Sequence, residues 1–194
     1  REAGHLLEAE PVSAAHAHGA GPAPVAAPQP AHDPGATAAH EFAARVRDIS
    51  EVLAAHPLPE PVVTLRSGRD RSRPLRVGYH DPCHLAHGQG VRVEPRTLLA
   101  RLAGVELVDL PNADWCCGSA GVYNLSHPDM ADAQLARKVD AMRASRAEVV
   151  VASNPGCMLH MARGARASGL DAQVVHIVDL LARAVERHDA RPAD

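Results

Sequence analysis

Residues 148–157 carry the sequence EVVVASNPGC, and this stretch decides the fold. The apolar residues that follow Glu148 predict a short strand that is buried on both faces of a sheet. Asn154 and Pro155 then predict the start of a helix, because asparagine caps helices and proline suits their first turn. A buried strand that leads directly into a helix is typical of a parallel α/β sheet. Cys157 lies in the first turn of the predicted helix.

The same alternation of strand and helix extends over the C-terminal part of the chain. Further strands are predicted at residues 75–79, 105–110 and 173–177. Helices are predicted at residues 95–103, 128–146, 156–168 and 178–188. Strands that alternate with helices form parallel βαβ units. We therefore expect a compact parallel-sheet domain of the α/β class over residues 74–190.

The chain before residue 74 has a different composition. Residues 1–10 resemble the end of a helix and are expected to be the tail of a preceding domain that this sequence lacks. Residues 11–36 are rich in proline and alanine, and proline at that density opposes both helix and strand pairing, so a linker is expected. Residues 37–56 are expected to form one helix, because four apolar residues share a face. These are Phe42, Val46, Ile49 and Leu53.

The overall composition excludes several classes of function. The 194 residues are 46% hydrophobic, which is enough for a buried core. The net charge of −3 gives no basic surface for nucleic acid. The apolar runs are too short for a transmembrane segment, and no secretory leader pattern is present. No glycine-rich dinucleotide motif or P-loop occurs, so no bound nucleotide is expected.

Each of the four cysteines follows a predicted strand. Cys83 follows the first strand, Cys116 and Cys117 follow the second, and Cys157 follows the third. The carboxyl ends of parallel strands share one edge of a sheet, so the four thiols are expected to meet there. Gly118, directly after the cysteine pair, lets the backbone approach a bulky group.

Two of these strand ends share a pattern. Asp81 and Pro82 precede Cys83, and Asn154 and Pro155 stand shortly before Cys157. Each pattern places a helix-capping residue and a proline before the cysteine. Both thiols are therefore expected at helix starts, where the thiolate form is favoured.

Converging thiolates on turns rich in N–H donors suit an anionic iron–sulfur cluster. A zinc-bound structural or docking domain without a redox role is the main alternative. Structural zinc sites usually pair cysteines two to four residues apart, a spacing that this sequence lacks, whereas the adjacent Cys116 and Cys117 can ligate different irons of one cluster. A third alternative is a thiol enzyme acting through Cys83 or Cys157 beside a histidine.

Three histidines lie close to Cys83 in the sequence, namely His80, His84 and His87. Histidine can replace a missing ligand or donate a hydrogen bond to a sulfur. An exposed or turn-capping position is an equally ordinary role for each of them. His84 is the preferred candidate because it adjoins a predicted ligand.

The flanks of the cysteines resemble a known family. The segments are YHDPCHLAHGQG (79–90), ELVDLPNADWCCGSAGVYNL (106–125) and NPGC (154–157). They resemble the cysteine-rich CCG domain of heterodisulfide reductase subunits, and most of all the second such domain in the iron–sulfur subunit of glycolate oxidase. The resemblance covers about residues 75–188, and RVRDISEVL (45–53) is more weakly similar to the segment that follows the first domain.

This resemblance implies a cofactor and a role. The cofactor is an iron–sulfur cluster, with 4Fe–4S expected, and the four cysteines are its ligands. The role is non-catalytic electron transfer from flavin-containing dehydrogenase subunits to an acceptor pool, with quinone expected as the acceptor. The residues expected to surround the ligands are His84, Asp81, Gly118 and Asn154. The expected location is the cytoplasm, with peripheral attachment to the inner face of the cell membrane as a further option.

The sequence also departs from the family pattern. The full pattern ends in a C-x-x-C pair, and here Asn154 stands at its first position while Cys157 matches its second. Four thiolates are enough to hold one cluster. The ferredoxin-like cysteine motifs and the first CCG domain of the full subunit have no counterpart here, so the chain is expected to be a C-terminal part of such a subunit.

Overall fold

The computed structural model of this chain describes residues 34–58 and 64–186. The tail predicted at residues 1–10, and the predicted linker as far as residue 33, lie outside these ranges. The last residues of that linker belong instead to helix α1 (Pro34–Arg45). The chain divides into two units, residues 1–45 and residues 46–194, and α1 is the described element of the first unit.

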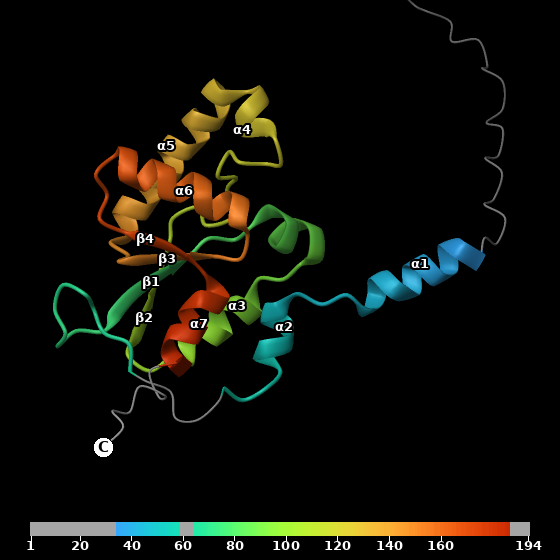
Figure 1. Cartoon of the computed structure of the whole chain (residues 1–194), viewed down its shortest axis with the longest axis horizontal. Coiled ribbons are helices and arrows are strands. Elements are labelled where there is room, and N and C mark those ends of the chain that lie inside the picture. The colour runs from blue at the N-terminus through green and yellow to red at the C-terminus, as the bar shows by residue number, and fades with distance from the viewer. Residues whose placement is uncertain (1–33, 59–63, 187–194) are drawn as a thin grey trace, which may run out of the picture. The chain divides into compact units, whose positions relative to one another are not determined.

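The second unit is built around a four-stranded sheet, and the predicted α/β fold is confirmed (Figure 1). The strands are β1 (Leu75–Tyr79), β2 (Val105–Val108), β3 (Val149–Ala152) and β4 (Gln173–His176). Their order in the sheet is β2-β1-β3-β4, and every neighbouring pair is parallel. The carboxyl ends of all four strands therefore lie at the same edge.

Helices cover both faces of this sheet (Figure 1). Helices α5 (Pro128–Ser145) and α6 (Pro155–Ala167) pack on one face, and α3 (Val93–Ala100) and α7 (Ile177–Glu186) pack on the other. Strand β3 is buried along its whole length, as its apolar run predicts. None of the helices among the described residues has the length and apolar character needed to cross a membrane.

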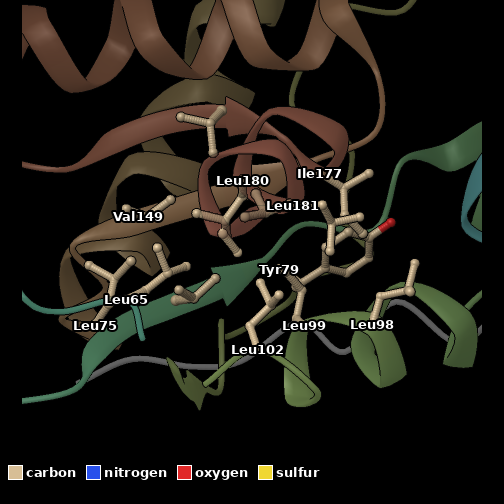
Figure 2. Packing of buried hydrophobic residues seen from close by; sticks show 14 residues of the cluster. Leu65, Leu75, Tyr79, Leu98, Leu99, Leu102, Val149, Ile177, Leu180 and Leu181 are labelled. Atoms are coloured by element: carbon tan, nitrogen blue, oxygen red, sulfur yellow. The ribbon is translucent and has the colours of Figure 1, made fainter. Parts of the chain in front are cut away.

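The two faces of the sheet have separate apolar cores. Alternate residues of β3 enter different cores, with Val149 and Val151 in one and Val150 and Ala152 in the other. Figure 2 shows the core between the sheet and helices α3 and α7, where leucines of both helices surround Tyr79 of β1. Two residues that follow strands, Cys117 and Cys157, belong to the core on the side of α5 and α6.

The helix predicted over residues 37–56 is interrupted. Helix α1 ends at Arg45, and α2 (Ile49–Ala54) begins after Asp48, whose backbone is extended. The Asp48 side chain accepts a hydrogen bond from the backbone of Ser50, and the Glu51 side chain accepts one from the Asp48 N–H at 2.8 Å. This capping box begins a new helix, and the extended cap residue prevents one continuous helix.

The helix start expected at Cys83 is present, as a π-helical segment that follows β1 at His84–Gln89. A second short helix, α4 (Tyr123–Ser126), precedes α5 and was not predicted. Both lie in connections that leave the carboxyl edge of the sheet. The main helices lie where they were predicted, with ends that differ by at most three residues; helix ends are the least well-defined part of such elements.

Candidate metal centre

The four cysteines gather at the carboxyl edge of the sheet, as predicted. Cys83 follows β1, Cys116 and Cys117 follow β2, and Cys157 lies in the first turn of α6 after β3. All four belong to the described residues and none forms a disulfide. Cys83 interacts electrostatically with Cys116 and Cys117, and the sulfurs of Cys117 and Cys157 lie within 4.8 Å of each other. The four thiols therefore form one cluster drawn from three separate loops.

Exposure differs sharply within this cluster. Cys83 is exposed and Cys116 is partly exposed, whereas Cys117 and Cys157 are only 1% and 8% exposed. The site thus has an outer side formed by Cys83 and Cys116 and an inner side formed by the other two thiols.

The loop that carries Cys116 and Cys117 is held by the glycine after them. Gly118 has a φ of +93°, and a Cβ atom at this position would lie 2.5 Å from the carbonyl oxygen of Ala131 in α5. Its backbone N–H donates a hydrogen bond of 3.3 Å to the Sγ of Cys116. The close approach predicted for this glycine is therefore an approach to the first turn of α5.

The helix that presents Cys157 has the predicted cap. The side-chain oxygen of Asn154 accepts a hydrogen bond of 3.0 Å from the backbone N–H of Cys157. Pro155 occupies the first turn of this helix. The side-chain nitrogen of Asn154 also lies 3.4 Å from Nδ1 of His84. Asn154 therefore connects the loop of Cys83 with the helix of Cys157.

The cap predicted at Asp81 is not formed. The segment after Cys83 begins without a side-chain cap hydrogen bond, and the Asp81 carboxylate instead accepts two hydrogen bonds of 2.7 Å from Arg96 of α3. The Asp81 backbone N–H donates a hydrogen bond of 3.0 Å to the carbonyl of Ala113. Asp81 thus ties the end of β1 both to α3 and to the loop that precedes the cysteine pair.

The protonation of the thiols also differs from the sequence prediction. Hydrogen bonding from Cys157 lowers the pKa of Cys117 to about 4. Hydrogen bonding to Cys117, together with burial, raises the pKa of Cys157 above its ordinary value. Partial burial and the neighbouring Cys116 thiol raise the pKa of Cys83. At Cys83 and Cys157, burial and the neighbouring thiols raise the pKa more than the helix start lowers it, so the thiolate form is not favoured at either position.

A buried lysine beside the cluster was missed from the sequence. Lys138 is 2% exposed, and its Nζ donates a hydrogen bond of 2.6 Å to the carbonyl of Asn112. Burial lowers the pKa of Lys138, while the nearby Cys117 acts in the opposite direction. The signal was present in the sequence, since Lys138 lies on the helix face shared by Leu135 and Met142.

Among the three histidines near Cys83, His80 is the one buried beside the sulfurs. It is 0% exposed, and its ring and the sulfurs of Cys117 and Cys157 each offer a ligand atom within 4.8 Å of the others. His84 and His87 are exposed; His84 lies against Asn154, and His87 lies against Arg92 and the Asp114 carbonyl. Sequence proximity to Cys83 did not reveal this difference.

A cleft of about 740 Å³ opens beside the Cys116 thiol. It is lined by Trp115 and Cys116 on one side and by residues of α5, including Arg137 and Lys138, on the other. The Arg137 guanidinium carbon lies 4.3 Å from the centre of the Trp115 ring, which is a cation–π arrangement. Cys116 is therefore reached from solvent through this cleft.

A parallel sheet with free cysteines from three loops gathered at its carboxyl edge defines a cysteine-rich α/β domain. Residues 77–162 match the family model of the CCG cysteine-rich domain. This segment is therefore a CCG cysteine-rich domain, and the resemblance noted in the sequence is confirmed.

Curated relatives support the same conclusion. The chain is 37% identical to the probable glycolate oxidase iron-sulfur subunit of Bacillus subtilis over 74% of its length, and 34% identical to the glycolate oxidase iron-sulfur subunit of Escherichia coli over 75%. It is also 38% identical to one of the subunits of the fumarate reductase (CoM/CoB) of Methanothermobacter marburgensis over 55%. The chain spans 31%, 34% and 22% of these proteins, respectively.

Proposed function

We propose that this domain binds an iron–sulfur cluster, with 4Fe–4S as the expected type, and transfers electrons. The proposed ligands are Cys83, Cys116, Cys117 and Cys157. The observation that carries this proposal is the convergence of four free thiols from three loops at one edge of the sheet. Cysteine thiolates are the protein ligands that such clusters take. A bound cluster supplies one-electron transfer, which the side chains of this site do not supply themselves.

The surrounding residues fit an anionic cofactor. The Gly118 N–H already points at a sulfur, and N–H donors to sulfur favour a reduced, more negative cluster. Lys138 places a buried positive charge near the cysteines, which offsets negative charge on thiolates and sulfides. Asn154 and Asp81 fix the loops that carry the ligands.

The relatives suggest the setting in which electrons move. We propose that the domain serves a complex that oxidises a 2-hydroxy acid such as glycolate, because two relatives are named as glycolate oxidase iron-sulfur subunits. Flavin-containing dehydrogenase subunits would remove electrons from the substrate, and an acceptor pool, with quinone expected, would receive them. We place this complex in the cytoplasm, with peripheral attachment to the inner face of the cell membrane.

The two alternatives have less support. The matched relatives are named for iron–sulfur subunits or for a fumarate reductase, and adjacent cysteines suit several irons better than one tetrahedral zinc ion. A thiol enzyme needs a nucleophile with a lowered pKa. The pKa values of Cys83 and Cys157, the two candidates for that role, are raised instead.

Anaerobic reconstitution tests the cofactor assignment. We expect the chain to take up iron and acid-labile sulfide in near-equal amounts and to turn brown. Single Cys→Ser variants at the four positions should lose iron, because a hard hydroxyl replaces a soft thiolate. Stoichiometric zinc without iron uptake under these conditions would overturn the proposal in favour of a structural zinc site.

A second experiment tests the division of labour with a flavin partner. The reconstituted chain alone should not oxidise glycolate with a dye acceptor, since the dehydrogenation is assigned to a flavin-containing partner. Glycolate-dependent dye reduction by the chain alone would show that this assignment is wrong.

A further inference from the structure

The buried imidazole of His80 has an unusual environment. His80 directly follows β1, and its backbone N–H donates a hydrogen bond of 2.8 Å to the carbonyl of Val151 in β3. The side chain is 0% exposed, and neither ring nitrogen makes a hydrogen bond of ordinary geometry within the described residues, although the ring lies close enough to the Cys117 thiol to lower the pKa of that thiol. An unsatisfied buried polar group destabilises the folded state. A position held so firmly by the sheet, with two unpaired nitrogens, therefore suggests a missing partner.

The groups closest to this imidazole indicate what the partner is. A ring nitrogen of His80 and the sulfurs of Cys117 and Cys157 all lie within 4.8 Å of one another, and all three residues are buried. Metal–nitrogen and metal–sulfur bonds of about 2.0 and 2.3 Å place the ligands of one ion roughly 3.5–4 Å apart. A small inward movement of these side chains is therefore enough for them to bind one iron or two neighbouring irons.

We propose that His80 is a nitrogen ligand of the metal centre, so that the domain holds its cluster with cysteines and one histidine. This inference rests on the proposed iron–sulfur function. His80 lies on the inner side of the site, beside the buried thiols.

Nitrogen hyperfine spectroscopy tests the ligand directly. The chain is reconstituted with iron and sulfide after labelling its histidines with ¹⁵N, and its paramagnetic state is examined by pulsed electron paramagnetic resonance. We expect one strongly coupled ¹⁵N nucleus in the unmodified chain. The coupling should persist in His160→Gln, which alters another buried histidine with an unpaired Nε2 that lies three residues beyond Cys157. The coupling should disappear in His80→Cys.

His80→Cys provides a second readout. This variant supplies a thiolate in place of the imidazole, so we expect it to keep its iron. Its reduction potential should fall, because histidine ligation raises the potential of an iron–sulfur centre relative to cysteine ligation. His80→Ala leaves the four thiolates in place but supplies no further ligand, so it should hold its cluster less tightly than His80→Cys does.

The outcomes separate the two proposals. Absence of iron uptake by the unmodified chain contradicts the iron–sulfur function itself. Full iron uptake with only weak nitrogen coupling, or with coupling that survives in His80→Cys, contradicts ligation by His80. In that case His80 either donates a hydrogen bond to a sulfur or fills space beside the site. The measurement on the unmodified chain decides this point even if a variant fails to fold.

Discussion

The Nζ of Lys138 donates a hydrogen bond of 2.6 Å to the carbonyl of Asn112, four residues before Cys116. It also lies 3.4 Å from the carbonyl of Ala113, and the ammonium group is shielded from solvent. A lysine in α5 thus fixes the approach to the cysteine pair. The same lysine brings a positive charge close to the thiols of the site.

Replacing Lys138 with methionine should lower the reduction potential of the reconstituted centre. A nearby unit charge in a medium of effective dielectric constant about 20 contributes on the order of 2 kcal/mol. For a one-electron step this corresponds to about 90 mV. Redox titration of Lys138→Met measures the shift. Arg137→Met is the matched control, because Arg137 is an exposed cation one residue earlier on the same helix and should change the potential much less. Equal shifts in both variants would argue against a specific role for the buried charge.

Gly118→Ala should destabilise the fold and lower iron occupancy. The substitution places a Cβ 2.5 Å from the Ala131 carbonyl at a φ of +93°, so the loop must move away from α5. We expect a loss of about 2–3 kcal/mol in the free energy of unfolding. Gly121→Ala is the control, because Gly121 has a positive φ but open space around it, and it should cost only about 1 kcal/mol. Urea denaturation and iron analysis of both variants make the comparison; similar losses would show that contact with α5 is unimportant.

Arg96→Met should weaken the domain by leaving the Asp81 carboxylate without its partner. Asp81 is 3% exposed, whereas the Arg96 side chain is partly exposed, so we expect a loss on the order of 2 kcal/mol rather than the larger cost of a fully buried pair. The exposed Arg163–Asp132 pair provides a control, and Arg163→Met should cost less than about 1 kcal/mol. Chemical denaturation distinguishes the two cases. An Arg96 variant as stable as the control would show that the ion pair contributes nothing.

Asn154→Ala should loosen the turn that presents Cys157 without removing a ligand. The lost cap should cost about 1 kcal/mol in the free energy of unfolding while iron content is retained. Asn154→Asp keeps an accepting oxygen and is expected to restore most of this stability. Asn154→Cys instead offers a fifth sulfur, and a changed visible spectrum would report its binding. If Asn154→Ala abolished iron binding while Cys157→Ser did not, the assignment of this segment would be wrong.

Tyr79 should make the domain sensitive to alkaline pH. Burial raises the pKa of Tyr79 from 10.0 to about 12, and its hydroxyl lies 3.3 Å from the Ser153 Oγ. Because the folded state favours the protonated phenol, its contribution is complete below pH 10 and is lost as the pH rises toward 12. The free energy of unfolding of the unmodified chain and of Tyr79→Phe should be measured from pH 9 to 12. Relative to Tyr79→Phe, the unmodified chain should lose up to about 2 kcal/mol of stability over this range. Parallel pH curves would contradict the predicted shift.

The features that the sequence predicted are mainly local ones. The continuous apolar run of β3 predicted a strand buried on both faces, and Asn154 before Pro155 predicted the cap of α6. Both depend on residues that are neighbours in the chain. The gathering of the cysteines followed from one topological rule, that parallel strands end at the same edge.

The features that were mispredicted or missed depend on partners distant in the sequence. Asp81 was predicted to cap a helix, but its carboxylate instead accepts hydrogen bonds from Arg96, which lies fifteen residues later in the sequence. His80 and His84 both lie close to Cys83 in the sequence, and the local sequence does not tell them apart. His80 is buried because it directly follows β1, which pairs with β3 inside the sheet. The helix pattern places Lys138 on the buried face of α5, but its carbonyl partners at Asn112 and Ala113 belong to a loop distant in the sequence.

The graded exposure of the four cysteines has a consequence for biogenesis. The thiols span residues 83 to 157 and meet only after β1, β2 and β3 have paired, so the newly made chain has no preformed site. Maturation is therefore expected to follow folding, with the cofactor delivered to an already assembled sheet. Cys83 and Cys116 face the solvent side, so a delivery protein would reach these two first, and transfer to Cys117 and Cys157 would complete insertion.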